Sequence, residues 1–398
     1  MNLVKVIKSI DTSICCHVLS IKQNTRSFYE EENIGRLHFV NFPIYSLYLC
    51  FSKYKEYKAV KKIIFFVLFE IVRIISFCFR NINPLGINEI EGSLYYCEIK
   101  KIVKKYNIDK IILISSPFST YKAGLKIKKV FNNVEVIAYQ FDQFVLTSDQ
   151  KIPKFIWEKR KEKRRKLIDK CADLFDDYFS FYKDLEYETD NRIKKIGLPL
   201  LVLKDYVQNT DRVDLPIKFV FAGSLNIGLR EPKDAISLIC SNHFENDFIV
   251  DFYHFGNCNG QIEYYRKQYP LIIRNHGQKS PEICYKAMSE ADFLVSIGTF
   301  QGNQIAGKTF DYISQRKPIL YFYYNEDDIN AKILQKYSLA ETIRINRSDD
   351  EANKKRISEF VNSIRGNTAD RNEILQQFSA FTPEYIAHQI LGLKNGNY

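Results

Sequence analysis

The chain has 398 residues, of which 45% are hydrophobic and 26% charged. This length is enough for two domains that each bury a core, and the composition excludes intrinsic disorder, collagen and a small disulfide-rich scaffold. Lysine and arginine number 58 against 47 aspartate and glutamate, so the formal net charge is +11 and favours anionic partners. Residues 151–170 hold ten basic and three acidic residues, so +7 of this charge lies in one short segment.

Cysteine and histidine usage argues against disulfides and metals. The nine cysteines show no Cys-x-x-Cys spacing, and the six histidines are scattered. We therefore expect free thiols, a cytoplasmic location, and no metal or other cofactor. The N-terminal sequence carries a charge every few positions, and so has no signal-peptide core.

The first long apolar stretch is Ile63–Phe79, of about seventeen residues. It contains Glu70 and Arg73, which are costly at the centre of a bilayer. We expect a helix that is either buried or amphipathic on a membrane surface, with basic residues at both ends, rather than a membrane span.

From about residue 108, apolar runs of strand length alternate with segments that can form helices. In the first half, strands are expected at Lys110–Ser115, Val134–Tyr139 and Asp177–Tyr182, with helices over Thr120–Phe131 and about Phe155–Ala172. This alternation is typical of parallel sheets covered on both faces. Strands in the second half are expected at Lys218–Ala222, Phe248–Phe255, Leu271–Arg274, Phe293–Ile297, Ile319–Phe322 and Glu341–Ile345.

Turn formers and charges interrupt the pattern near Gly197–Pro199 and Lys204–Pro216, which predicts a domain boundary. The fold class is therefore α/β, with two Rossmann-like, doubly wound domains facing each other across a cleft. We place the domains at residues 1–200 and 201–375, with a helix in 376–398 that packs back on the first domain. Ligands of open α/β sheets bind at the carboxyl ends of the strands.

Three loops at such strand ends have unusual compositions. The first, Phe221–Asn226, contains Gly223 and Ser224 and precedes a helix expected near Glu231. Glycine lets a ligand approach closely, amides at a helix start can hold a phosphate, and Arg230 adds charge. An ordinary strand-to-helix turn is the alternative.

The second loop leads into a helix whose first turn contains Lys308, with Asp311 three residues later. A cation is unfavourable at a helix start unless an anion shares the site, and the spacing puts both side chains on one face. A phosphate binder beside a carboxylate that accepts two ribose hydroxyls suits a nucleotide. A surface ion pair is the alternative.

The third loop contains His276 and Gly277, which mark either a base pocket or a plain turn. In the first half, His17 and His38 lie in apolar runs, where a core position is expected. Asp142 follows a predicted strand and is expected to face the cleft.

The run Asn303–Leu320 resembles the donor-site motif of GT-B glycosyltransferases of the glycosyltransferase family 4 type, which reads approximately N-x-x-P-S-K-x-F-E-Y-x-x-x-x-K-P in the polysaccharide-building branch. Phe221–Leu225 is similar to the phosphate loop of that family, and Ser289–Ile297 to one of its strands. The matching positions are Lys308, Phe310, Tyr312, Lys317 and Pro318, while Asp311 replaces Glu, and Ala306 and Gly307 replace Pro-Ser.

This resemblance implies a GT-B fold with an acceptor-side first domain and a donor-binding second domain. It implies retaining, metal-independent transfer of a sugar from a nucleotide-diphosphate sugar to a glycan or lipid-linked oligosaccharide, in bacterial-type surface polysaccharide (capsule or lipopolysaccharide) biosynthesis. Asp311 would accept the ribose hydroxyls and Asn303 would lie near the donor sugar. Lys308 and Gly223-Ser224, with Arg230, would hold the diphosphate. The leaving phosphate can take the proton of the acceptor, and Asp142 is an acceptor-side candidate.

The start of the chain departs from this pattern. Asn2–Thr12 resembles the first helix and Ile14–Ile21 the second strand of such a domain, so the opening strand and its glycine loop are missing. We expect either a truncated or mis-set start or an atypical first domain. A truncated chain would keep nucleotide binding but not catalysis.

The basic run Lys159–Lys166 predicts either a solvated helix face or docking on anionic lipid. Together with Ile63–Phe79 it favours a peripheral location on the inner face of the cytoplasmic membrane. Nucleic acid is not expected, because aromatic residues do not interleave with the basic run. Two other functions stay open: a sugar-nucleotide 2-epimerase-like enzyme and a non-catalytic nucleotide-sugar-binding partner subunit.

Overall fold

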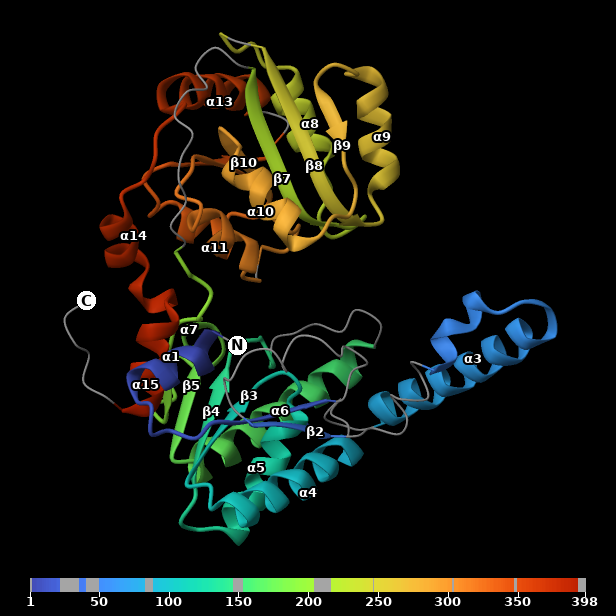
Figure 1. Cartoon of the computed structure of the whole chain (residues 1–398), viewed down its shortest axis with the longest axis vertical. Coiled ribbons are helices and arrows are strands. Elements are labelled where there is room, and N and C mark those ends of the chain that lie inside the picture. Colours follow the sequence, from blue (N-terminus) through green and yellow to red (C-terminus); the bar gives the residue numbers. More distant parts are fainter. Residues whose placement is uncertain are drawn as a thin grey trace. The chain divides into compact units, whose positions relative to one another are not determined.

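The computed structural model describes residues 2–21, 36–40, 50–82, 89–145, 153–203, 216–245, 247–302, 304–346 and 349–392 (Figure 1). The chain divides into two compact units. One comprises the described residues up to Leu198 together with the described residues from Ile386, and the other comprises the described residues of Pro199–Tyr385. The helix α15 (Pro383–Leu391) therefore lies mainly in the first unit.

The first unit begins with α1 (Asn2–Ile10), and the parallel pair β1 (His17–Ile21) and β2 (Arg36–Val40) follows. The helix and the strand expected at the start of the chain are thus present. The core position expected for His17 and His38 is wrong. Both side chains are half-buried, and the Nδ1 of His17 lies 2.9 Å from the Nε2 of His38. The two strands form a separate small sheet, which leaves the pair at its surface beside Tyr106.

A second, four-stranded sheet forms the centre of the first unit. All of its strands are parallel and run in the order β3-β4-β5-β6. The three strands expected from the sequence are present, while the short β6 was not predicted. The elements after β2 are η1 (Lys53–Glu56), α3 (Ala59–Ile82), α4 (Glu89–Tyr106), β3 (Lys110–Ile114), α5 (Ser119–Val130), β4 (Glu135–Gln140), α6 (Lys154–Leu174), β5 (Asp177–Ser180), α7 (Lys183–Glu186) and β6 (Ile193–Lys195).

Helix α5 packs on this sheet through residues at helical spacing. Ala123 and Ile127, four residues apart, are fully buried and lie in one cluster with Val136 and Ala138 of β4. These β4 residues alternate along the strand and so point to one face of the sheet. The apolar positions of helix and strand therefore meet in a single core.

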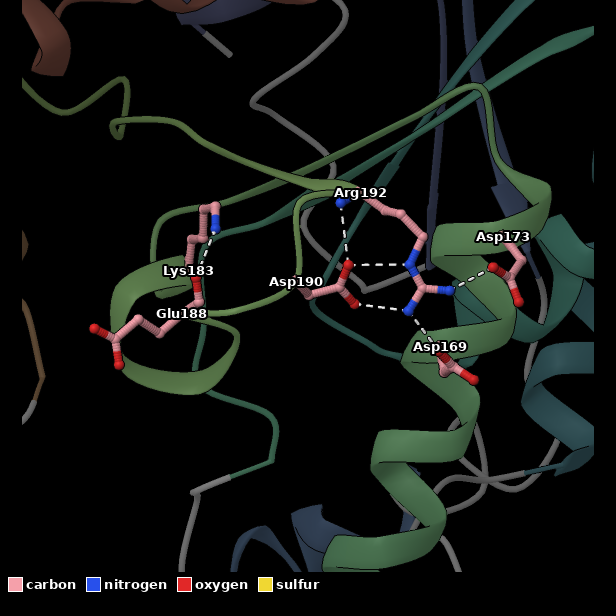
Figure 2. Close-up of polar contacts among 6 residues, drawn as sticks. All are labelled: Asp169, Asp173, Lys183, Glu188, Asp190 and Arg192. Atoms are coloured by element: carbon pink, nitrogen blue, oxygen red, sulfur yellow. Dashed lines mark hydrogen bonds and ion pairs between the residues drawn. The ribbon is translucent and has the colours of Figure 1, made fainter.

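Arg192, which directly precedes the edge strand β6, links this edge of the sheet to α6 through ion pairs. The guanidinium of Arg192 pairs with both oxygens of Asp190, at 2.8 and 3.0 Å, and reaches Asp169 at 2.5 Å and also Asp173 (Figure 2). Asp169 and Asp173 are one turn apart on α6, which explains how one planar guanidinium reaches both. These hydrogen bonds raise the pKa of Arg192 above its ordinary value.

The second unit is a six-stranded, wholly parallel sheet in the order β12-β11-β10-β7-β8-β9. Numbered within the unit, this is 6-5-4-1-2-3, the strand order of the dinucleotide-binding fold. All six strands expected from the sequence are present, so the α/β class with Rossmann-like units is confirmed. The elements are β7 (Ile217–Leu225), α8 (Lys233–Cys240), β8 (Phe248–Gly256), α9 (Asn259–Gln268), β9 (Ile273–Asn275), α10 (Pro281–Ser289), β10 (Phe293–Ile297), α11 (Gly307–Ile313), β11 (Ile319–Tyr323), α12 (Ile329–Leu334), β12 (Ala340–Arg344), α13 (Asp350–Ile364), α14 (Arg371–Phe378) and η3 (Ser379–Phe381).

Both faces of this sheet are covered. Phe219 and Phe221 of β7 pack in one cluster with residues of α8 and α13, while Val220 and Ala222 pack with α10 and α11. A strand buried on both sides needs apolar residues at every position. This requirement explains the uninterrupted apolar runs from which the strands were predicted.

Three further features of the described residues concern apolar helices, thiols and clusters of potential metal ligands. The apolar stretch at residues 63–79 lies within α3, and none of the helices in the described ranges has the length and apolarity needed to cross a membrane. The eight cysteines whose side chains the structure describes are all free. The described residues also include no cluster of three or more metal-ligand side chains suited to an ion.

Gly256, at the end of β8, provides a test of the fold. Its φ of +112° disfavours any other residue, and a methyl group there would lie 2.1 Å from the main-chain oxygen of Leu225. We expect Gly256→Ala to lower the free energy of unfolding by at least about 2 kcal/mol, measured by urea denaturation. Gly260→Ala, in α9 with open space around it, is the control and should be neutral or stabilising by up to about 1 kcal/mol. Equal effects of the two substitutions would contradict the prediction.

Candidate functional site

The candidate site lies where the strand order of the second sheet reverses. β7 pairs with β8 along its whole length, from Ile217 to Leu225, but it pairs with β10 only at Phe219 and Val220. Beyond Val220 the two strands no longer pair. In open α/β sheets such a switch point forms the ligand crevice at the carboxyl ends of the strands.

The hydroxyl of Tyr312 in α11 hydrogen-bonds main-chain groups of β7 that β10 no longer pairs. It accepts a hydrogen bond from the Ala222 N–H (2.8 Å) and donates one to the Ala222 carbonyl (3.3 Å). Both main-chain groups point to the side from which β10 has departed, where they would otherwise lack a partner. Burial raises the pKa of Tyr312 above its ordinary value, so the phenol stays protonated. By the alternation of a parallel strand, the N–H of Ser224, two residues on, is directed to the same side.

The structure corrects the expected loop after this strand. β7 continues three residues further than predicted, because β8 pairs with it up to Gly256, so Gly223 and Ser224 lie in the strand and not in a loop. A tight turn follows, in which Asn226 and Arg230 exchange two main-chain hydrogen bonds of 2.9 and 2.8 Å. The next helix, α8, begins at Lys233 rather than near Glu231.

This turn brings Arg230 back to the end of its own strand. Its Nη1 donates to the Oγ of Ser224 at 3.4 Å, whereas its Nε is shielded from solvent and has no partner among the described residues. Burial lowers the pKa of Arg230, and the nearby Asp328 opposes this effect. The turn therefore holds a partly buried cation with an unused donor at the crevice.

Asp328, which the sequence analysis missed, is a fully buried carboxylate near this cation. Its Oδ1 accepts hydrogen bonds from the hydroxyl of Tyr321 and the N–H of Ala331, both at 2.9 Å, and so caps α12. Its Oδ2 has no partner within the described part of the chain. Burial raises the pKa of Asp328 above the ordinary value of 3.8. An aspartate just before a helix predicts a cap, but no sequence signal indicates that this one is buried.

The loop after β10 meets the turn after β7. The N–H of Phe300 donates to the carbonyl of Leu229 at 2.9 Å, which joins the turn after β7 to the loop that leads into α11. Asn330 of α12 fixes the far end of the loop, since its side chain accepts from the Ala306 N–H and donates to the Gln304 carbonyl, both at 2.8 Å. Asn303, the predicted donor-sugar residue, lies outside the described residues.

Lys308 and Asp311 lie on one face of α11, as their spacing predicts. The Lys308 Nζ is 3.1 Å from the Asp311 Oδ2, and the two side chains are 38% and 29% exposed. Tyr285 of α10 donates to the other carboxylate oxygen at 3.1 Å. Asp311 and Arg230 both shift the pKa of Tyr312, in opposite directions, so cation and carboxylate lie around the same phenol.

His276 and Gly277 directly follow β9, as the sequence predicts, and β9 ends at Asn275, opposite Phe252 of β8. The Nε2 of His276 is 2.8 Å from the Oδ1 of the buried Asp251, and its ring stacks on Tyr253 with centroids 4.4 Å apart. Tyr253 packs against a cluster that contains buried residues of α10 and α11. The ring of His276 therefore lies on the face of the sheet that α10 and α11 cover.

Asp142 belongs to the first unit, where it follows β4. Its N–H donates to the Oγ of Ser115 at 3.3 Å, and its carbonyl accepts from the side chain of Gln140 at 3.0 Å. Burial raises the pKa of the Asp142 carboxyl. Glu186, which the sequence analysis missed, fixes this loop by accepting from the N–H groups of Phe144 and Val145.

No protein-family model matches the chain, and no curated protein matches it. The structure is similar to the lipopolysaccharide outer core galactosyltransferase WaaB, at 12% identity and a TM-score of 0.49, over 76% of this chain and 78% of that one. It is also similar to CalG4, the calicheamicin glycosyltransferase (11%, TM-score 0.46, 98% and 94%). A third solved structure is a putative UDP-N-acetylglucosamine 2-epimerase from Listeria monocytogenes (12%, TM-score 0.47, 75% and 77%). At these TM-scores the argument for function rests on the site itself.

Substitutions of Asp328 test the buried carboxylate. Asp328→Ala leaves the Tyr321 hydroxyl and the Ala331 N–H without an acceptor and should cost about 2–4 kcal/mol of unfolding free energy. Asp328→Asn keeps an acceptor and should cost less.

The raised pKa of Asp328 means that the folded state holds the proton of this carboxyl group more tightly than the unfolded state does. Its contribution to stability is therefore present below about pH 3.8 and lost as the pH rises through the folded-state pKa. The stability of the wild type relative to Asp328→Asn should fall as the pH rises above about 4 in urea denaturation, and a pH-independent difference would contradict the assignment.

Proposed function

We propose that the chain is a GT-B glycosyltransferase that moves a sugar from a nucleotide-diphosphate sugar to a glycan or a lipid-linked oligosaccharide. The observation that carries this proposal is the set of side chains around Tyr312. Two cations, Arg230 and Lys308, and one carboxylate, Asp311, lie at the switch point of a sheet with the dinucleotide-binding strand order. A nucleoside diphosphate offers the matching groups, two phosphates and a ribose diol.

Arg230 and Lys308 would hold the diphosphate. The unused Nε of Arg230 and the partly exposed ammonium of Lys308 are donors that carry positive charge, and the Ser224 N–H is directed to the same crevice. Negative charge grows on the diphosphate as the sugar leaves, so fixed cations stabilise the transition state more than the ground state. With two cations present, we propose a reaction that needs no metal ion.

Asp311 would bind the ribose. One of its oxygens accepts from Tyr285 and the other from Lys308, and a carboxylate offers about four lone-pair sites in all. Two sites therefore remain for the two ribose hydroxyls. Tyr285 and Lys308 fix the orientation of the carboxylate, so little freedom is lost when the sugar binds.

The finer parts of the proposal rest on the resemblance to glycosyltransferase family 4. They are retention of configuration, a place for Asn303 beside the donor sugar, proton transfer to the leaving phosphate, and a role in bacterial surface polysaccharide assembly. Asp142 is proposed on the acceptor side, because its raised pKa suits a group that exchanges a proton with an acceptor hydroxyl.

The alternative, a sugar-nucleotide epimerase, is favoured by one observation. The His276–Asp251 pair is a histidine oriented by a buried carboxylate, an arrangement that can move protons on a sugar without an acceptor. An epimerase converts its nucleotide sugar in the absence of any acceptor, whereas a transferase needs one. Product analysis of the donor incubated alone therefore separates the two.

A thermal-shift panel of UDP, GDP, ADP and CMP with their common sugar conjugates tests the donor site. We expect one nucleoside diphosphate and its sugars to raise Tm, because a ligand that binds only the folded state stabilises it by about 2.7 kcal/mol at a hundredfold excess over Kd. The absence of a shift with every member would contradict a nucleotide site in this unit.

Substitution of the ion pair on α11 assigns the two roles. Lys308→Ala should weaken the binding of the nucleoside diphosphate by about tenfold or more and that of the nucleoside little, in calorimetric titration. Asp311→Ala should remove the preference for ribo- over deoxyribonucleotides. Lys354→Ala is the matched control, since Lys354 forms the same i,i+3 pair with Glu351 on α13 at 2.7 Å. If the first two variants bind like this control, the nucleotide site lies elsewhere.

A further inference from the structure

Helix α3 carries a long apolar stripe that the described residues leave uncovered. Seven of its aliphatic side chains are between 40% and 68% exposed, although the helix has 24 residues and belongs to a compact unit. Soluble proteins seldom expose a contiguous apolar patch of this kind without a binding role. The seven residues are Val60, Ile63, Ile64, Val67, Ile71, Ile74 and Ile75.

The spacing of these residues places them on one side of the helix. Successive members are one, three or four positions apart, which at 3.6 residues per turn keeps them within about a third of the circumference. The neighbouring face is already used. Phe65 packs against Phe51 with ring centroids 5.5 Å apart, Phe69 against Tyr54 at 5.6 Å, and Val72 is 9% exposed. The α3 stripe is therefore a second apolar face, separate from the one that packs against the residues around η1.

Basic residues lie on helix α3 and in the segment just before it. Residues 53–82 contain seven lysines and arginines against two glutamates, a net charge of +5. Lys58, Lys61 and Lys62, at the start of α3, are all exposed. Two copies of this chain that paired through α3 would bring together two segments of +5, which repel each other. The charge instead complements an anionic surface.

We propose that α3 docks on the surface of an anionic membrane, with the α3 stripe in the boundary between headgroups and acyl chains and the lysines at the phosphates. This partner does not depend on the proposed sugar transfer. The helix lies along the surface and does not cross it, in keeping with the two charged residues, Glu70 and Arg73, near its middle.

A lysine groove in the same unit supplies a second electrostatic signal. It lies between α5 and α6, has a volume of about 400 Å³, and is lined by five lysines and two leucines. Not all of the basic run of α6 is available to a ligand, because Arg160 is buried and Arg164 donates to the carbonyl of Phe144 at 3.0 Å. Stable membrane attachment usually needs two signals, here the α3 stripe and the lysine groove. The residues that line the groove are Lys122, Leu125, Lys126, Lys163, Lys166, Leu167 and Lys170.

The first experiment is flotation of the full chain with vesicles of pure phosphatidylcholine and of phosphatidylcholine mixed with phosphatidylglycerol. We expect binding to the mixed vesicles that weakens as salt rises, and much weaker binding to the neutral ones. Inorganic phosphate at the same ionic strength as the salt control should compete no better than that salt. Equal binding to both kinds of vesicle, or none to either, would overturn the proposal.

Two variants separate the apolar and electrostatic parts. The triple variant Ile64→Gln, Val67→Gln and Ile71→Gln keeps helix formers at exposed positions and should lower the partition coefficient at least about tenfold. Lys58→Gln with Lys62→Gln should lower it on anionic vesicles alone, by about fivefold for each lysine. Lys163→Gln with Lys170→Gln tests the lysine groove in the same way.

A triple variant at exposed leucines elsewhere is the matched control: Leu174→Gln, Leu185→Gln and Leu271→Gln, at 42%, 52% and 87% exposure. It should bind vesicles like the wild type, and an unchanged Tm should show that both triple variants fold. If the α3 variant binds vesicles as the control does, the proposal is wrong. It is also wrong if the α3 variant alters only the oligomeric state in light scattering, because the α3 stripe would then pair with a second copy.

Discussion

The whole candidate site depends on how the main-chain N–H and C=O groups at the end of β7 are hydrogen-bonded. Where the strand order reverses, β7 loses β10 as a partner after Val220 while it keeps β8 as far as Leu225. Main-chain groups at that point are buried and must be paired. The hydroxyl of Tyr312 pairs both groups of Ala222, and in doing so it fixes α11, and therefore Lys308 and Asp311, at a set position beside the strand end. The phenol of Tyr312 thus both pairs the end of β7 and positions the charged groups beside it.

Charge is distributed unevenly around this phenol. Arg230 on one side keeps an unused donor and Asp328 an unused acceptor, and both atoms are shielded from solvent. A buried charge is costly, and the attraction of Asp328 offsets part of the cost of burying Arg230. Lys308 and Asp311, by contrast, form a direct ion pair near the surface. Arg230 therefore has its carboxylate partner at a distance, whereas Lys308 is in direct contact with Asp311. An incoming anion changes the electrostatic environment of Arg230 more than that of Lys308.

Much of this could be predicted from the sequence because the second sheet is buried on both faces, and continuous apolar runs then mark every strand. The i,i+3 spacing of Lys308 and Asp311 likewise predicted a shared face. The end of β7 was not predictable, since its last residues, Gly223-Ser224-Leu225, are typical of a turn and are held in the strand only by pairing with β8. Asp328 was missed because the burial of its carboxylate arises from tertiary contacts, which no local sequence pattern indicates. His17 and His38 were misplaced because apolar neighbours in sequence do not reveal that β1 and β2 form a sheet of their own. For α3, the sequence left a buried and a surface helix open, and only side-chain exposure distinguishes them.

The division of the chain also has a consequence for how the protein is made. The first unit contains the N-terminal half of the sequence and most of α15, which is among the last described elements to be synthesised. The described residues of the second unit all lie between Pro199 and Tyr385. On a ribosome, the described residues of the second unit are therefore synthesised before α15 is finished, although the first unit begins to emerge much earlier. Until α15 is synthesised, the first unit lacks its last described helix, whereas the described strands of the second unit are already present.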